Sequence, residues 1–339
     1  MQIALRSTLL RALLTTVLLL AAASAPAQAI VDIEFVKKAI ERGALLWDTR
    51  DEATFVKGHI PGAVNIGDPN NELRDPNRED YLPLPQIEKL LGSAGIDPQR
   101  EIVVYGVRAA TSNYFAHLTL RYFGAARAYV FHDGIDAWRA AGLPLATQAS
   151  PRKPVALKLV PQPGVTVGTD EVLAAVRNRS AQIVDARTTR EFSGDDIRSL
   201  RGGHIPGAVN VPYEQNWQDP QTLSRLQRGQ TRDSSGMSLK PVADLRTLYA
   251  GLDPNKETIV YCQSGVRAAE TATVLRDLGF RDVKVYDASW LGWGSNLALP
   301  AANETFFNVG ALNSRLARMQ MRIDQLEAEL EQARRAAGR

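Results

Sequence analysis

The only cysteine of the chain, Cys262, stands at the end of an apolar β-branched run and just before a short loop with Ser264 and Gly265. From Arg267 onward, small and apolar residues recur at helical spacing. This order predicts a strand, a tight loop and a helix. In such a geometry successive backbone N–H groups point into one concavity, and the helix N-terminus adds partial positive charge. A thiolate held there is stabilised relative to its thiol and becomes the better nucleophile.

The six residues from Cys262 to Arg267 resemble the active-site loop of the rhodanese family, whose members are sulfurtransferases that carry sulfane sulfur as a cysteine persulfide. The resemblance implies that Cys262 is the catalytic nucleophile. It also implies that the rest of the loop stabilises the persulfide: Gln263, Ser264, Gly265, Val266 and Arg267. The alternative is that a lone cysteine is only a small buried hydrophobic residue. The flanking segments described next favour the reactive thiol.

An internal repeat of about 140 residues organises the chain. An Asp-x-Arg segment at 48–50 and a Gly-His-Ile-Pro-Gly-Ala-Val-Asn segment at 58–65 recur at 185–187 and 203–210. A period this long indicates a domain duplication, because solenoid repeats are about 20–50 residues long. In each copy, apolar strands alternate with helical segments. We therefore expect two α/β domains with mostly parallel sheets covered on both faces, which the resemblance identifies as two rhodanese-like doubly wound domains.

The two copies differ at the loop that carries the cysteine. Tyr105-Gly-Val-Arg108 in the first copy matches Tyr261-Cys-Gln-Ser-Gly-Val-Arg267 in the second, so three residues, Cys-Gln-Ser, are missing from the first. The first copy therefore lacks the nucleophile, and we expect it to be inactive. Two-domain rhodaneses and mercaptopyruvate sulfurtransferases share this arrangement, and the resemblance covers nearly all of residues 31–300.

Two further segments resemble motifs of the family. Residues 185–192 match Asp-x-Arg-x-x-x-Glu-Phe, and residues 287–293 match Asp-Gly-Ser-Trp-x-Glu-Trp except that Ala288 replaces the Gly and Gly292 replaces the Glu. Any polar contact of that Glu is lost here. An arginine near a thiolate can bind a dianion such as thiosulfate with two parallel hydrogen bonds. This makes Arg187 a candidate substrate contact, although it can equally mark a solvated helix start.

Other duplicated or neighbouring polar residues are weaker candidates for chemistry. Asp48 and Asp185, and likewise His59 and His204, occur in both copies, including the copy without a nucleophile. We therefore expect them to hold loops and turns rather than to react. Arg190 is a less favoured substrate contact than Arg187, three residues earlier. The sequence shows no metal-ligand cluster, nucleotide-binding glycine motif or haem motif, so we expect no cofactor and no metal.

The N-terminus has the pattern of a signal peptide. Arg6 and Arg11 precede an apolar run at 12–23, and Ala27-Gln28-Ala29 supplies small residues for cleavage. An uncleaved anchor is the alternative, but a spanning helix needs about 20 apolar residues. We expect cleavage after Ala29 and a periplasmic or secreted protein. The formal charge of +3 then falls to +1 (3 − 2), which gives no electrostatic case for nucleic acid.

The remaining boundaries follow from composition. The expected parts are a signal peptide at 1–29, an inactive domain at 30–146, a Pro-rich extended linker at 147–164, a catalytic domain at 165–300 and a tail at 301–339. A polar insertion at 215–240 is expected to be a surface loop, and a lid over the site is the alternative.

The tail carries an apolar seam with alternating spacings of four and three residues: Leu312, Leu316, Met319, Ile323, Leu326, Leu330 and Ala333. This pattern predicts a coiled-coil helix at about 311–336. Such a stripe can pack on its own domain. We favour self-association or docking to a protein partner through it.

The expected function is an exported sulfurtransferase that moves sulfane sulfur from a donor such as thiosulfate to cyanide, a thiol or a protein cysteine through a Cys262 persulfide. In the family that this chain resembles, thiosulfate-type loops often carry basic residues after the Cys, and mercaptopyruvate-type loops resemble Cys-Gly-Ser-Gly-Val-Thr. This loop departs from both, with neutral Gln263 and Ser264 and with Arg267 where both types have Thr, and we favour thiosulfate or another sulfane donor over mercaptopyruvate. A non-enzymatic sulfur carrier docked through the tail is the alternative. A phosphatase is remote, because related phosphatase loops place five residues between Cys and Arg, and this loop has four.

Overall fold

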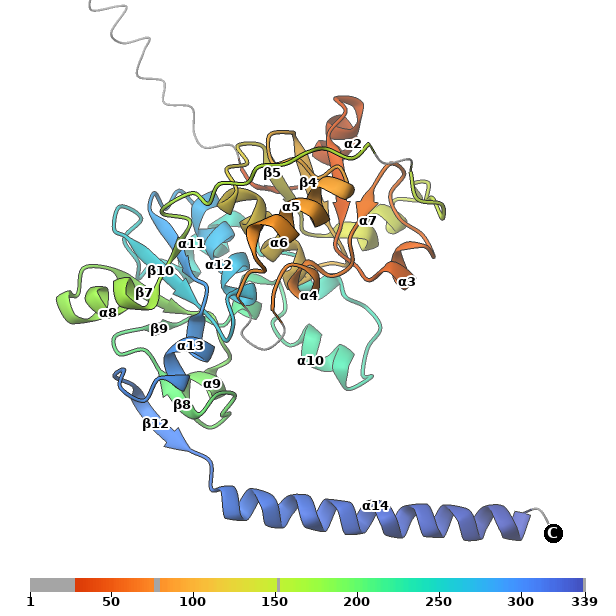
Figure 1. Cartoon of the computed structure of the whole chain (residues 1–339), viewed down its shortest axis with the longest axis vertical. Coiled ribbons are helices and arrows are strands. Elements are labelled where there is room, and N and C mark those ends of the chain that lie inside the picture. The colour runs from red at the N-terminus through yellow and green to blue at the C-terminus, as the bar shows by residue number, and fades with distance from the viewer. Residues whose placement is uncertain (1–27, 76–79, 151–152, 338–339) are drawn as a thin grey trace, which may run out of the picture.

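Each half of the chain builds a five-stranded, all-parallel sheet, and the two sheets have the same topology (Figure 1). The computed structural model describes residues 28–75, 80–150 and 153–337. The predicted signal peptide lies almost wholly outside these residues. The shared topology confirms the expected α/β fold with two duplicated domains. No helix among the described residues is long and apolar enough to cross a membrane.

The first sheet is formed by strands that lie in the order β1 (Ile30–Val31), β5 (Ala128–Phe131), β4 (Ile102–Tyr105), β2 (Leu45–Asp48) and β3 (Val64–Asn65). The central strand β4 is buried along its whole length, as expected for an apolar run covered by helices on both faces. The helices of this domain are α2 (Ile33–Glu41), α3 (Glu52–Phe55), α4 (Pro69–Glu72), α5 (Leu84–Ser93), α6 (Thr111–Tyr122) and α7 (Gly134–Ala140).

The second sheet repeats this order with β6 (Thr166–Val167), β11 (Val283–Tyr286), β10 (Thr258–Tyr261), β7 (Gln182–Asp185) and β9 (Val209–Asn210). Its helices are α8 (Thr169–Asn178), α9 (Thr189–Ser193), α10 (Thr222–Gln227), α11 (Val242–Leu248), α12 (Val266–Asp277) and α13 (Ser289–Ser295), with 3₁₀ turns η1 (Tyr213–Asn216) and η2 (Ser235–Met237). An antiparallel pair, β8 (Arg201–His204) with β12 (Ala302–Phe306), extends the second domain beyond the expected boundary at residue 300.

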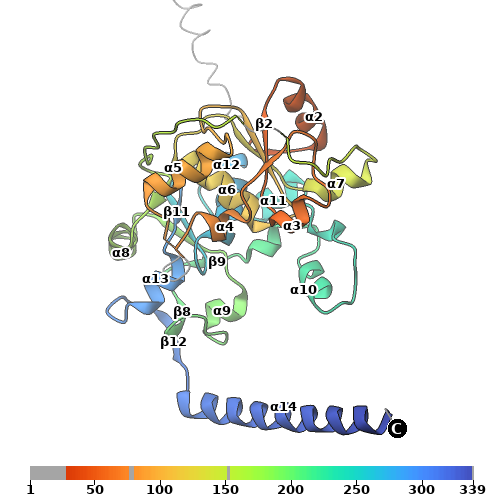
Figure 2. The ribbon, with the colours of Figure 1, turned by 45° about the vertical axis from the view of Figure 1, so that its right-hand side comes forward.

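The two domains meet along α6 and α12, the helices that follow the central strands (Figures 1 and 2). Both helices are buried over most of their length because each lies between its own sheet and the other domain. Tyr114 and Phe115 of α6 share one apolar cluster with Ala268 and Ala272 of α12. The domains therefore have a common core, and the helix after the cysteine loop is held from both sides.

The linker at 147–164 is extended in its described part, as predicted, and lies along the first domain. Val155 N–H donates to the carbonyl of Gly92 (2.9 Å), and Leu159 packs with Ile87 and Leu91 of α5.

The insertion at 215–240 is exposed or half-buried over residues 223–236, as its polar composition predicts, but both of its ends are anchored in the protein. It forms part of the domain interface, because His132 of the first domain hydrogen-bonds through Nε2 to the carbonyl of Met237 (2.8 Å), and Ser238 Oγ donates to Asp133 (2.6 Å). Trp217 is fully buried and donates to Glu270 of α12 (2.8 Å). The polar composition does not reveal this role at the interface, because the contacts come from a few buried residues among many exposed polar ones.

The tail forms one helix, α14 (Val309–Ala337), close to the predicted bounds. It projects away from both domains (Figures 1 and 2), and all of its described side chains are exposed. The tail therefore does not pack on its own domain in this structure.

Candidate active site

Cys262 follows directly after the central strand β10 and is 1% exposed. The loop after it runs at once into α12, whose N-cap is Gly265 with φ +86°. A side chain is excluded at Gly265, because a Cβ there would lie 2.4 Å from Oδ1 of Asp287. The sequence therefore yields the predicted strand, tight loop and helix at the carboxyl end of the sheet, where α/β folds bind ligands.

Three successive carbonyls of the loop are held from outside. The carbonyl of Cys262 accepts from Trp290 N–H (3.0 Å), and that of Gln263 accepts from Leu291 N–H (2.8 Å). The carbonyl of Ser264 accepts from the guanidinium of Arg74, which comes from the first domain (Nη1, 2.7 Å).

The direction of these carbonyls decides where the loop amides point. In a planar trans peptide the C=O and the following N–H point in opposite directions. The N–H groups of Gln263, Ser264 and Gly265 are therefore turned away from the three donors. Within the described residues, no N–H of residues 263–267 donates to a protein acceptor. The loop thus presents a set of free donors beside the cysteine, which is the arrangement of an anion-binding concavity.

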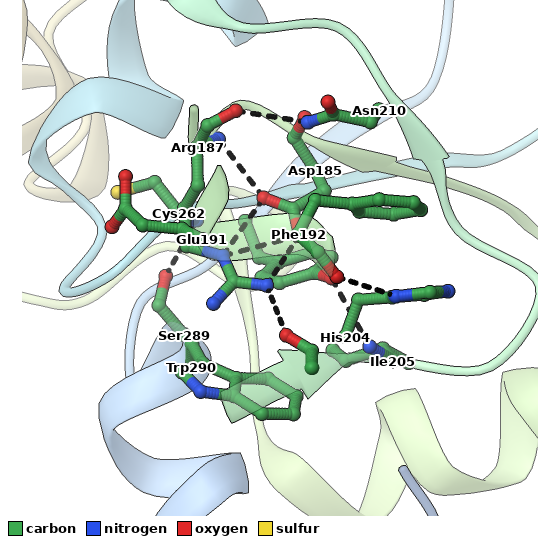
Figure 3. Close-up of polar contacts among 12 residues, drawn as sticks. Asp185, Arg187, Glu191, Phe192, His204, Ile205, Asn210, Cys262, Ser289 and Trp290 are labelled. Atoms are coloured by element: carbon green, nitrogen blue, oxygen red, sulfur yellow. Dashed lines mark hydrogen bonds and ion pairs between the residues drawn. The ribbon is translucent and has the colours of Figure 1, made fainter. Parts of the chain in front are cut away.

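Ser289 fixes the backbone of the cysteine itself (Figure 3). Its Oγ accepts from Cys262 N–H (3.1 Å) and donates to the carbonyl of Tyr286 (2.7 Å). Ser289 has φ +50°, which is a strained conformation for a residue other than glycine. In the first domain Gly134 has the same φ, and a Cβ there would lie 2.1 Å from the carbonyl of Gly106 in the shortened loop.

Arg267 forms a doubly hydrogen-bonded ion pair with Glu191, with both N–O distances at 2.8 Å. Burial alone would raise the pKa of Glu191, but its hydrogen bonds and the charge of Arg267 outweigh burial and lower that pKa to about 2. Burial also acts to lower the pKa of Arg267, whereas Glu191 and the negative charge of a Cys262 thiolate raise it. The positive charge of Arg267 is therefore stabilised by Glu191 and also by the charge of a Cys262 thiolate.

Arg187 lies close to the cysteine loop, with its guanidinium carbon 4.6 Å from the ring centroid of Trp290. Its guanidinium is buried, pairs with both carboxylate oxygens of Asp185 and donates to the carbonyl of Gly203 (2.7 Å; Figure 3). Arg50 makes the same contacts with Asp48 and Gly58 in the inactive domain. These contacts hold the turn in both copies. These contacts use Nε and Nη2, so Nη1 is the nitrogen that can reach a substrate anion, and the role of Arg187 as a donor contact stays a prediction.

The duplicated histidines are structural, as expected. His204 Nδ1 lies 2.9 Å from the carbonyl of Phe192 and its ring stacks on the Phe192 ring. His59 makes the same two contacts with Phe55. Both imidazoles therefore belong to turns. Among the described residues, no three His, Cys, Asp or Glu side chains gather closely enough to hold a metal ion.

Sequence reasoning did not assign several residues that shape this site. Ser289 and Glu191 lay inside motifs already recognised, and only their contacts show what they do. Arg198 is half exposed, its carbonyl accepts from Gln263 Nε2 (2.7 Å), and its guanidinium lies 3.5 Å from Glu191. Arg190, the less favoured candidate, is exposed. Arg74 carries no local signal at all.

Comparisons with known proteins agree with this geometry. The family description "Rhodanese-like domain" matches residues 32–141 and 168–296. The thiosulfate sulfurtransferase of Corynebacterium glutamicum is 35% identical over 267 residues, which are 74% of this chain and 81% of that protein. SseA of Escherichia coli, described as a 3-mercaptopyruvate sulfotransferase, has a TM-score of 0.64 and 28% identity, and the match covers 78% of this chain and 99% of that one.

An ergothioneine biosynthesis enzyme from Chlorobium limicola shares the fold, with a TM-score of 0.67, 19% identity and coverage of 81% of this chain and 71% of that one. Both repeats of the present chain thus match one family, and the relatives span the two domains together. The chain belongs to the tandem-domain rhodanese family of sulfurtransferases.

Proposed function

We propose that this protein is an exported thiosulfate sulfurtransferase that works through a persulfide on Cys262. The observation that carries the proposal is the set of loop amides turned inward beside the cysteine by the three anchored carbonyls. Such donors stabilise negative charge on a sulfur atom, as an oxyanion hole stabilises charge on oxygen. The first domain lacks these loop residues, and its Arg74 holds one of the three carbonyls of the cysteine loop in the second domain.

The reaction consists of two sulfur transfers with no net redox change. The Cys262 thiolate attacks the outer sulfur of thiosulfate, the S–S bond to the sulfonate sulfur breaks, and sulfite leaves with that electron pair. The enzyme holds Cys262–S–S⁻, whose terminal charge lies against the loop N–H groups. A nucleophilic acceptor such as cyanide then takes the outer sulfur as thiocyanate and returns the thiolate.

The choice of donor rests on charge near the loop. Gln263 and Ser264 are neutral, so the cations that can attract a dianion are the arginines around the loop. Arg198 is half exposed and lies near Glu191, and Arg267, at the end of the loop, is paired with Glu191. The name of the Corynebacterium relative also favours thiosulfate. Arg187 joins this set through Nη1, since its Nε and Nη2 bind Asp185 and the carbonyl of Gly203.

Steady-state kinetics test the proposed reaction. With thiosulfate and cyanide varied together, the mechanism predicts parallel double-reciprocal plots, because sulfite leaves before the acceptor binds. Intersecting plots would contradict a free persulfide intermediate. Cys262→Ser should abolish turnover. Mercaptopyruvate as the preferred donor would leave the persulfide chemistry standing and overturn the donor assignment.

Export is supported by a contact at the expected cleavage site. The carboxylate of Asp277 accepts from Ala29 N–H and from Ile30 N–H, both at 2.8 Å. Cleavage after Ala29 converts the second donor into an α-ammonium group beside this carboxylate. Burial raises the pKa of Asp277, so a cation at that point favours its ionised form. N-terminal sequencing of protein from the periplasmic fraction should begin at Ile30, and an N-terminus upstream in cytoplasmic material alone would refute export.

A second candidate role is a sulfur carrier docked through α14, which the exposure of that helix favours. Removal of residues 309–339 distinguishes a docked sulfur carrier from a free-standing enzyme. A free-standing enzyme keeps both its turnover and its cellular function, whereas a docked carrier keeps the Cys262 chemistry and loses the cellular function.

A further inference from the structure

We infer that α14 pairs with α14 of a second copy of this chain in a parallel, in-register, two-stranded coiled coil. The first support is the exposure of its apolar seam. Leu316 is 54% exposed and Leu330 is 51% exposed, and no residue of α14 is buried. Most helical stability in proteins comes from packing of an apolar face, and this helix of 29 residues buries none of its apolar seam against the described residues of its own chain.

The spacing of the seam assigns the heptad positions. The three-residue steps run from a to d, so the a positions are Leu316, Ile323 and Leu330. The d positions are Leu312, Met319, Leu326 and Ala333. Apolar residues fill both sets without a buried polar residue. A second helix with the same pattern, in the same register, buries the whole seam.

The flanking charges select the partner and its direction. In parallel helices each g position faces the e position five residues further along the other chain. Arg322 then faces Glu327 of the partner subunit, and Glu329 faces Arg334 of the partner subunit. By symmetry this gives four pairs of opposite charge and none of like charge. The helix is thus complementary to a copy of itself.

Antiparallel pairing satisfies the same residues less well. The register that pairs Leu312 with Leu330 forms two attractive pairs, between Arg315 and Glu329, but sets Arg322 opposite Arg322 of the partner subunit, which is repulsive. The register shifted by one heptad forms two attractive pairs between Arg322 and Glu329 but sets Leu312 opposite only the small Ala337. A partner protein with another sequence would have to reproduce this charge pattern.

The connection to the second domain gives the pairing a structural consequence. α14 begins three residues after β12 ends, so each catalytic domain lies at the N-terminal end of its helix. Parallel pairing places two catalytic domains at one end of the coiled coil. Antiparallel pairing separates them by the helix length, about 43 Å at 1.5 Å per residue. This inference extends the proposed association through α14 and does not depend on sulfur transfer.

Site-specific cross-linking tests the direction in the full chain. A Cys262→Ser background removes the only cysteine and with it the sulfur chemistry, so the outcome is separable from the proposed function. Leu312→Cys and Ala333→Cys are then introduced singly, and each protein is oxidised with copper phenanthroline. Parallel pairing predicts a disulfide-linked dimer from each single variant. A monomer, or a dimer that cross-links only when Leu312→Cys is mixed with Leu330→Cys, would overturn the inference.

Charge-reversal variants test how much the charge pairs stabilise the dimer, with dimer affinity measured by sedimentation equilibrium. Arg322→Glu places like charges opposite each other twice in the dimer and should weaken dimerisation at least about tenfold. Adding Glu327→Arg should restore the affinity. Arg318→Glu, at an outer c position, is the matched control and should have little effect. A wild-type chain that stays monomeric at high micromolar concentration, or binds only a different protein, would refute the second copy as partner.

Discussion

Arg74 of the first domain donates to the carbonyl of Ser264 in the cysteine loop of the second, across 190 positions of sequence. The same guanidinium donates through Nη2 to Asp287 Oδ1 (3.1 Å), and a Cβ on Gly265 would lie only 2.4 Å from that oxygen. The first domain, which has no cysteine, therefore takes part in orienting the cysteine loop of the second. Its retention beside the active domain has a direct structural explanation.

Replacing Arg74 should impair the cysteine loop. Arg74→Met keeps the aliphatic stem but frees the Ser264 carbonyl, so the Gly265 N–H is no longer fixed toward the sulfur. We expect about a tenfold fall in kcat/KM, in line with the loss of one charge-assisted hydrogen bond. The rate of Cys262 alkylation by iodoacetamide at pH 7 should fall with it.

Arg108→Met is the matched control for Arg74. Arg108 also crosses the interface, donating to Ser234 (3.1 Å), but it does not touch the cysteine loop. It should leave the alkylation rate unchanged. Equal losses in both variants would mean that the interface acts only through stability, and would contradict a positioning role for Arg74.

Ser289 offers a test that separates strain from hydrogen bonding. Ser289→Ala leaves Cys262 N–H without its acceptor and keeps a side chain at φ +50°. Ser289→Gly loses the same acceptor but relieves the strain. We expect both variants to lose activity, and we expect the Gly variant to unfold at the higher temperature, since Ala costs about 1 kcal/mol more at this φ. Full activity in the Gly variant would show that the hydroxyl is dispensable.

The Glu191–Arg267 pair should make stability depend on pH in the acidic range. Because the folded pKa of Glu191 is about 2, below its ordinary value of 4.5, the unfolded state binds a proton first as the pH falls. The contribution is complete above about pH 4.5 and declines toward pH 2. Glu191→Gln leaves Arg267 without its anion and should cost about 3–5 kcal/mol at pH 7. Urea unfolding at pH 3 and pH 7 should show this penalty shrinking at the lower pH.

Glu270 should have the opposite pH dependence. It is fully buried on α12, and burial raises its pKa well above the ordinary value, with Glu214 adding to the effect. As the pH rises above about 4.5, the carboxyl ionises in the unfolded state first, so stability falls. Glu270→Gln keeps an oxygen for Trp217 and removes this loss. We expect its thermal midpoint to exceed that of the wild type at pH 8, by about 2 °C or more, and to match it at pH 4.

Much of the site was predictable because it is local in sequence. The β10, loop and α12 segment follows from adjacent apolar, glycine and alanine residues, and the duplicated Asp-x-Arg and Gly-His motifs mark turns that both domains need. What sequence could not supply is contact between distant segments. Nothing local to Arg74 points to a loop in the other domain. The anchors in the 215–240 insertion are hidden for the same reason.

The tail shows a further limit of sequence reasoning. The spacing of residues 312–333 predicts a helix with an apolar seam, but the pattern is the same whether that seam packs on its own domain or on another chain. Only the position of α14 away from both domains separates the two possibilities. The sequence therefore predicts the apolar seam but not whether the seam packs against the chain's own domains.

Intact mass spectrometry before and after thiosulfate treatment tests the central claim most directly. The persulfide mechanism predicts a gain of one sulfur atom, its loss on adding cyanide, and no gain in Cys262→Ser. The mature protein without any thiosulfate serves as the reference. An unchanged mass after thiosulfate, in a protein whose Cys262 still reacts with iodoacetamide, would contradict sulfur transfer from thiosulfate through this cysteine.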